Sequence, residues 1–179
     1  MLASGDPAKA VTLLKEAVSV ADTTGDLEPA AEGRSGLALA YLHLADPAPA
    51  LAAATAAYEF PTEEPRLRLL QGVTLGQLQR VEEAVQAFSD ALTKAERLLA
   101  LAELSIAALQ VRALALSGLA AATDDPIGAT QAAEAFTHLQ RATRAAGVVA
   151  DSVWLLDAIT SSFDTAGVLA DVIGAVRDG

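Results

Sequence analysis

Two histidines and three pairs of adjacent carboxylates are the residues of this chain best suited to chemistry. A bound metal takes about three or four protein ligands, and the chain offers only His43 and His138, without any cysteine. Glu134 lies one helical turn before His138, which is the spacing of a solvated pair on a helix surface. The carboxylate pairs stand where helices are expected to begin, and negative charge at a helix N-terminus stabilises the helix by interacting with its dipole. These pairs are Glu63-Glu64, Glu82-Glu83 and Asp124-Asp125.

Other patterns that carry chemistry are missing from the sequence. The glycines of Gly72-Val-Thr-Leu-Gly76 are four residues apart inside a helical pattern, where they favour close helix packing rather than phosphate binding. No nucleophile elbow is present, and a cofactor-free hydrolase would need an acid and a base facing one cleft. We therefore predict that the protein is not an enzyme and holds neither a metal nor a cofactor.

The charge of the chain restricts its partners. Twelve Lys and Arg against 23 Asp and Glu give a net charge of −11, without a basic block. Such a surface repels nucleic-acid phosphate, so we expect a neutral or basic protein or peptide partner; the same acidity also serves simply to keep the protein soluble. The first residues lack the basic and apolar regions of a signal peptide, which predicts a cytoplasmic protein.

The composition predicts an all-α fold. Hydrophobic residues make up 53% of the chain but aromatic ones only 4%, so most of the apolar content is Ala and Leu, which are strong helix formers. An Asp followed by a Pro is a preferred helix start, and it occurs at Asp6-Pro7, Asp46-Pro47 and Asp125-Pro126. The segment 98–122 approaches the length of a membrane span, but Glu103, Gln110 and Arg112 predict one long buried helix and no membrane association.

The segment 75–92 predicts a helix end, a tight turn at Gln79-Arg80 and a second helix. Ala84, Phe88 and Ala91 recur at the spacing of one buried face, and Gly72 stands twelve residues before Ala84. Similar sets occur three more times, and their first members, at 10, 50, 84 and 129, are 40, 34 and 45 residues apart. The sets are Ala10, Leu14, Ala17; Ala50, Ala54, Ala57; and Ala129, Ala133, Phe136, or equally Ala132, Phe136, Leu139.

These small–large–small sets, together with the segment 37–45, resemble the tetratricopeptide repeat (TPR) family, and the long periods resemble its longer-helix bacterial members. The resemblance implies an α-α superhelix of antiparallel helix pairs, with about three and a half pairs in residues 1–147. Ala145-Ala-Gly147 predicts a helix stop, and residues 148–179 are expected to form a C-terminal cap with a final helix that begins after Asp164.

In such a superhelix, the first helix of each pair lines a concave face. Carried over residue by residue, the resemblance places eleven residues there: Glu32, Ser35, Leu39, His43, Arg66, Leu69, Val73, Gln77, Gln110, Leu114 and Ser117. The set lacks the Lys and Asn clamp with which some family members hold a C-terminal carboxylate. Glutamates at both Leu39 and Val73 are expected to abolish partner binding while barely changing the melting temperature.

Other side chains are expected in the core or in ion pairs. The aromatic residues Tyr41, Tyr58, Phe88, Phe136 and Trp154 have the spacing of residues that pack between helices. Arg34 and Arg68 occupy the same repeat position, 34 residues apart. They either pair with acids of a neighbouring helix or point into the groove, and the sequence leaves both alternatives open.

The expected function is a protein–protein interaction module that binds a peptide segment or a partner helix in its concave groove. The alternative is a ligand-sensing regulatory domain whose groove closes on a small molecule or a short peptide. The helix 8–21 has apolar residues on more than one face. It predicts either a homodimer through this helix or a native chain that is longer at its N-terminus. The remaining alternative is that Leu13 and Val18 simply stay partly exposed, as single apolar residues often do.

Overall fold

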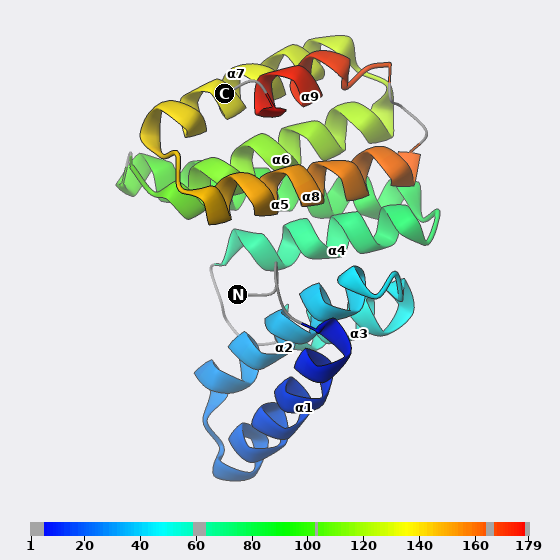
Figure 1. Ribbon diagram of the computed structural model, residues 1–179, viewed down its shortest axis with the longest axis vertical. Coiled ribbons are helices and arrows are strands. Elements are labelled where there is room, and N and C mark those ends of the chain that lie inside the picture. Colours follow the sequence, from blue (N-terminus) through cyan, green and yellow to red (C-terminus); the bar gives the residue numbers. More distant parts are fainter. Residues whose placement is uncertain (1–5, 59–63, 103, 164–166, 178–179) are drawn as a thin grey trace.

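The computed structural model describes residues 6–58, 64–102, 104–163 and 167–177, and these residues form helices without any strand (Figure 1). The all-α expectation is confirmed. The helices are α1 (Pro7–Thr24), α2 (Leu27–His43), α3 (Pro47–Tyr58), α4 (Pro65–Gln77), α5 (Val81–Leu101), α6 (Ile106–Thr123), α7 (Pro126–Ala142), α8 (Ala146–Phe163) and α9 (Ala170–Arg177).

From α1 to α7, each helix packs against the next one along the chain, in alternating directions (Figure 1). The order changes at α8, which packs against α6 and α4 instead of α7. The short α9 then returns to α7, which is its main contact. Helix α8 therefore packs on two helices, α4 and α6, that are not its direct neighbours in the sequence.

The helix starts follow local signals in the sequence. The Asp6 carboxylate accepts hydrogen bonds from the backbone N–H groups of Ala8 and Lys9, at 3.0 and 3.3 Å. Asp125 accepts one from Ile127 at 2.9 Å, and each cap precedes a proline in the first helical turn. The turn between α4 and α5 is tight because Gln79 takes a left-handed conformation, with a φ of 60°.

The single long helix expected over 98–122 is wrong. Instead, α5 runs on to Leu101 and α6 begins at Ile106. The break follows from Ser105, whose side chain accepts a hydrogen bond from the backbone N–H of Ala108 at 3.4 Å. Among the described residues, α6 alone is long and apolar enough to cross a membrane, and 67% of it is buried inside the protein. A buried core helix fulfils those two criteria equally well.

The C-terminal boundaries also differ from expectation. Helix α7 ends at Ala142, where Thr143 is extended, and α8 already begins at Ala146. Gly147 therefore lies in the first turn of α8 and does not terminate a helix. The final helix begins at Ala170, and Asp164, which was expected to precede it, is outside the described residues.

The main core forms around Phe88, as its spacing predicted. Phe88, Ala84 and Ala91 are fully buried, and a β-carbon added to Gly72 would lie 2.6 Å from the Phe88 ring. Gly118 of α6 faces the same ring at the same distance. Of the other aromatic residues, Phe136 is buried and Tyr41 is partly buried, whereas the side chain of Tyr58 is outside the described set.

Two arginines at equivalent positions tie first helices to second helices. Arg34 of α2 pairs with Asp22 of α1 at 2.8 Å, and Arg68 of α4 pairs with Asp90 of α5 at 3.3 Å. These pairs decide between the alternatives that the sequence left open, because both arginines bind acids of the neighbouring helix. Arg34 thus joins α2 to the helix before it, and Arg68 joins α4 to the helix after it.

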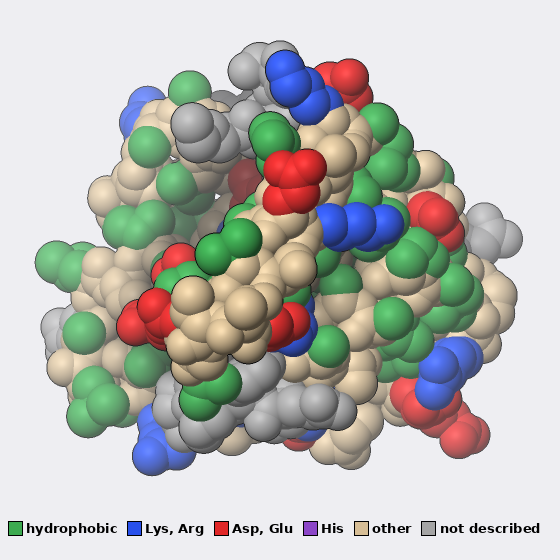
Figure 2. Space-filling view, turned by 90° about the horizontal axis from the view of Figure 1, so that it is seen from below, with side chains coloured by type: hydrophobic (Ala, Val, Ile, Leu, Met, Phe, Trp, Pro, Cys, Tyr) green, Lys and Arg blue, Asp and Glu red, His purple; other side chains and the backbone are tan. Residues whose placement is uncertain are grey.

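The exposed face of α1 is mixed. Leu14 and Val18 pack against α2, where Gly36 and Gly33 allow the approach, while Leu13 and Val20 remain 56% and 63% exposed. Figure 2 looks at this end of the molecule and shows hydrophobic, acidic and basic side chains interspersed over its surface. A homodimer through α1 stays a prediction.

Candidate functional site

The residues expected on a concave face come from α2, α4 and α6, and they differ sharply in burial. Leu69, Val73 and Leu114 are fully buried, and Gln110 and Ser117 are buried as well. Arg66 and Gln77 are partly exposed. On α2, Glu32 is exposed, and Ser35, Leu39 and His43 are partly exposed. The α2 part of the face is therefore partly exposed, with Leu39 packed at the edge of the core, whereas Leu69, Val73 and Leu114 belong to the core itself.

Helix α8 accounts for this burial. It lies along α4 and α6 (Figure 1), and its Leu155, Leu156 and Ile159 are buried in the same hydrophobic cluster as Leu69, Val73 and Leu114. The first helices of two pairs thus hold a helix from elsewhere in the chain. We call this surface of α4 and α6 the α8 seat, and define it by Arg66, Leu69, Val73, Gln110 and Leu114.

Polar contacts hold the N-terminal half of α8 in this seat. Arg66 Nη2 lies 3.0 and 2.9 Å from the two carboxylate oxygens of Asp151. Gln110 Nε2 donates to Asp151 at 2.9 Å and to the Ser152 hydroxyl at 3.1 Å, and it also lies 3.4 Å from the Val148 carbonyl oxygen. Arg66 is the second residue of α4 and Gln110 the fifth of α6, so both contacts are made near the start of their helices.

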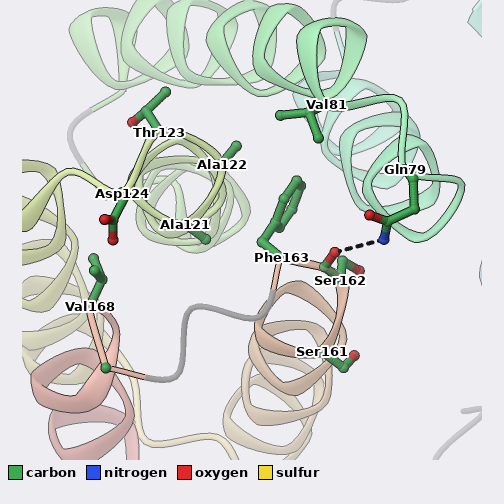
Figure 3. Close-up of a pocket in the computed structure, with 11 residues that line it drawn as sticks. Gln79, Val81, Ala121, Ala122, Thr123, Asp124, Ser161, Ser162, Phe163 and Val168 are labelled. Atoms are coloured by element: carbon green, nitrogen blue, oxygen red, sulfur yellow. Dashed lines mark hydrogen bonds between the residues drawn. The ribbon is translucent and has the colours of Figure 1, made fainter.

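A second polar contact holds the other end of α8. Gln79 Nε2, just beyond α4, donates to the Ser162 carbonyl oxygen at 3.2 Å (Figure 3). Phe163 packs so close to Gly76 that a β-carbon there would lie 2.5 Å from its ring. The start of α4 meets the start of α8 and the end of α4 meets the end of α8. The two helices are therefore parallel, and α8 is held along its whole length.

His43 connects α2 to the same helix. Its imidazole stacks on the indole of Trp154, with ring centroids 3.7 Å apart and an interplanar angle of 23°. Burial lowers the pKa of His43 below its ordinary value, and the nearby Asp151 carboxylate opposes this shift without cancelling it. The neutral imidazole is the form that the folded protein favours.

We therefore expect the stability to fall as the pH is lowered from about 7.5 to 5.5, below the ordinary histidine pKa near 6.5. A depressed histidine pKa means that the unfolded chain binds more protons in this window, so acid favours unfolding. Urea melts at several pH values would show a flatter dependence for His43→Gln than for the wild type. His138→Gln, exposed on α7, is the matched control and should keep the wild-type slope. Equal slopes for all three proteins would contradict this linkage.

An open hollow of about 700 Å³ lies where α4, α6 and α8 end (Figure 3). The C-terminal ends of α4, α6 and α8 carry partial negative charge, and Asp124 adds a carboxylate, whereas Val81 is the first residue of α5, whose N-terminus carries partial positive charge. It is lined by Gln79, Val81, Ala121, Ala122, Thr123, Asp124, Ser161, Ser162, Phe163, Gly167 and Val168.

Two of the paired carboxylates, Asp125 and Glu83, have structural roles. Asp125 caps α7, and Glu83 pairs with Arg80, whose hydrogen bond lowers the Glu83 pKa. Glu63 is outside the described residues. Within the described part of the chain, no group of three or more His, Asp or Glu side chains is placed to hold a metal ion.

Sequence reasoning missed the residues of α8 that fill the seat, because it assigned α8 to a cap at the end of the array. Asp151 and Trp154 stand three residues apart beside the apolar face of α8. A charged and an aromatic residue next to an apolar stripe indicate a helix that makes specific side-chain contacts on more than one face. This pattern could have indicated that α8 packs between other helices. Comparisons of the chain with protein-family models, curated proteins and solved structures found no match.

Proposed function

We propose that this protein is a tetratricopeptide-like array that works as a protein–protein interaction module. The supporting observation is that α4 and α6 already hold a helix, α8, by apolar contacts along their length and polar contacts at both ends. Helix-in-groove binding relies on the same combination of an apolar stripe and a few directional contacts. In this proposal the helix pairs form a superhelix, and its first helices make the recognition surface.

The open part of that surface is on α2. Glu32 is exposed, Ser35 and Leu39 are partly exposed, and Trp154 of α8 borders them through its stack on His43. A partly exposed aromatic residue beside aliphatic and polar groups is typical of an interface anchor. With a net charge of −11 over the chain, the partner protein as a whole is neutral or basic.

A photo-reactive amino acid at Leu39 tests this function. We expect it to cross-link a defined partner in extracts of the native host, because Leu39 lies on the open α2 face. The same group at Ser89, which is exposed on α5, is the matched control and should give no such product. Equal labelling from both positions would contradict a specific partner at the α2 face.

The hollow at the ends of α4, α6 and α8 favours a second candidate function, the sensing of a small positively charged ligand. The three helix ends and Asp124 supply the negative potential that would attract it. A thermal-shift screen of cationic metabolites separates the two functions, because a ligand that binds the folded protein raises its melting temperature by mass action.

A further inference from the structure

We infer that the partner segment is an amphipathic helix that copies the face of α8 and binds by displacing α8 from its seat. This inference rests on the proposed interaction function and names the chemistry of the partner. The copied face carries a carboxylate, an aromatic residue three positions later, and aliphatic residues at the next positions, as Asp151, Trp154, Leu155, Leu156 and Ile159 do in α8.

The chain order supports an exchangeable α8. Every helix from α1 to α7 packs on its neighbour in sequence, whereas α8 leaves α7 and occupies a surface made by α4 and α6. Helix α9 has its larger interface with α7 and a smaller one with α8. Gln140 of α7 donates to the Ala175 carbonyl oxygen at 2.6 Å, and Val172 and Val176 of α9 are buried. The contacts within α1–α7 and those between α7 and α9 do not involve α8.

The polar contacts determine which helix fits the seat. Arg66 and the Gln110 side-chain amide both donate to the Asp151 carboxylate, in a region where these groups are largely shielded from water. An arriving helix without a carboxylate at this position would leave the Arg66 guanidinium partly buried without its acid, which is costly. The partner segment is therefore locally acidic at this one point, even though the acidic protein as a whole favours a neutral or basic partner.

The aromatic position follows from His43. The imidazole stacks on Trp154 and is partly buried, so a helix that replaced α8 without an aromatic residue would expose this face of the ring. The aliphatic positions follow from Leu69, Val73 and Leu114, which are fully buried in the same hydrophobic cluster as Leu155, Leu156 and Ile159 of α8. A helix with this combination supplies partners for Arg66, for the aromatic face of His43 and for the aliphatic side chains of the seat.

Trp154 is the only tryptophan of the chain, so its fluorescence reports on α8 alone. The probe is a labelled peptide of residues 146–163 with Trp154→Phe, which keeps an aromatic ring but adds no tryptophan signal. Adding it to the full-length protein is expected to shift the Trp154 emission to the red, saturably, as the indole leaves His43 for water. The anisotropy of the label should rise over the same concentration range.

Two variants sharpen the test. Asp151→Asn in the protein weakens the internal contact but leaves Arg66, Gln110 and His43 in place, so the peptide should bind about tenfold more tightly. A control peptide that also carries Asp151→Lys meets Arg66 with a like charge and should bind at least about tenfold more weakly.

The outcomes are distinguishable. Absence of a red shift in both proteins at about 1 mM peptide, the limit of weak binding, would overturn the inference. A rise in anisotropy without a red shift would also overturn it, since the peptide would then bind while α8 stays seated. The interaction function is decided separately by the cross-link at Leu39, which does not require α8 to move.

Discussion

Val73→Glu unfolds the protein or lowers its free energy of unfolding by about 4 kcal/mol or more, because it buries a charge without a partner. Val73 is completely buried in the seat, between the α4 backbone and the apolar face of α8. The resemblance to tetratricopeptide repeats had placed Val73 on an exposed concave surface, where a glutamate would change binding alone. Urea denaturation followed by circular dichroism measures the difference directly.

Leu39→Glu is the matched control, because Leu39 stands 34 residues earlier at the same repeat position. Leu39 is partly exposed on α2, so we expect a loss of only about 1 kcal/mol. Similar, small losses for both variants would contradict the burial of Val73 and restore an open groove over α4. A large loss for both would place Leu39 in the core as well, and would remove α2 as the open part of the recognition surface.

The contrast between these two positions shows how far the sequence predicts the fold. Local signals were sufficient for helix starts, as at Asp6 and Asp125, because capping depends on the neighbouring backbone alone. The contact between Gly72 and Phe88 could also be predicted from the sequence, because a small and a large residue at this spacing indicate close packing of two helices. The signals at Asp46-Pro47, Gln79-Arg80 and Asp125-Pro126 predicted the starts of α3, α5 and α7 without any long-range information.

The position of α8 could not be predicted in the same way. Leu155, Leu156 and Ile159 form an apolar stripe that would fit the end of the array as well as the surface of α4 and α6. The pair that decides between them, Arg66 and Asp151, joins residues 85 positions apart. No periodicity connects such residues, so the sequence gives the face of α8 but not the surface that it covers.

The missed break between α5 and α6 has a different cause. Neither Gly nor Pro occurs between Leu101 and Ile106, and the break depends on Ser105, which serves as a cap only once the chain has turned. Leu101 and Leu104 are 81% and 75% exposed there. Their hydrophobicity suggested a continuous buried helix, whereas they lie at the tip of a helical hairpin.

The second large effect is expected at Gly118. A helical Gly→Ala change normally stabilises a protein by about 0.5–1 kcal/mol, since alanine loses less backbone freedom on folding. At Gly118 the new methyl group would lie 2.6 Å from the Phe88 ring. The ring has little room to retreat, because the backbone of Gly72 approaches it so closely that a β-carbon there would also lie 2.6 Å from the ring. Overpacking of this kind costs about 1–3 kcal/mol, so the sign of the effect reverses.

Gly174→Ala is the control for the direction of the stability change, because Gly174 lies inside α9 and a β-carbon there meets no atom within 4 Å. Urea melts should show Gly174→Ala at or above wild-type stability and Gly118→Ala about 2 kcal/mol below it. The smaller side chain of Phe88→Leu should relieve the clash, so that the double mutant with Gly118→Ala is more stable than the two separate losses predict, by about 1 kcal/mol. Strictly additive losses would mean that Phe88 does not press on Gly118, and that the close approach of α4, α5 and α6 does not depend on these two glycines.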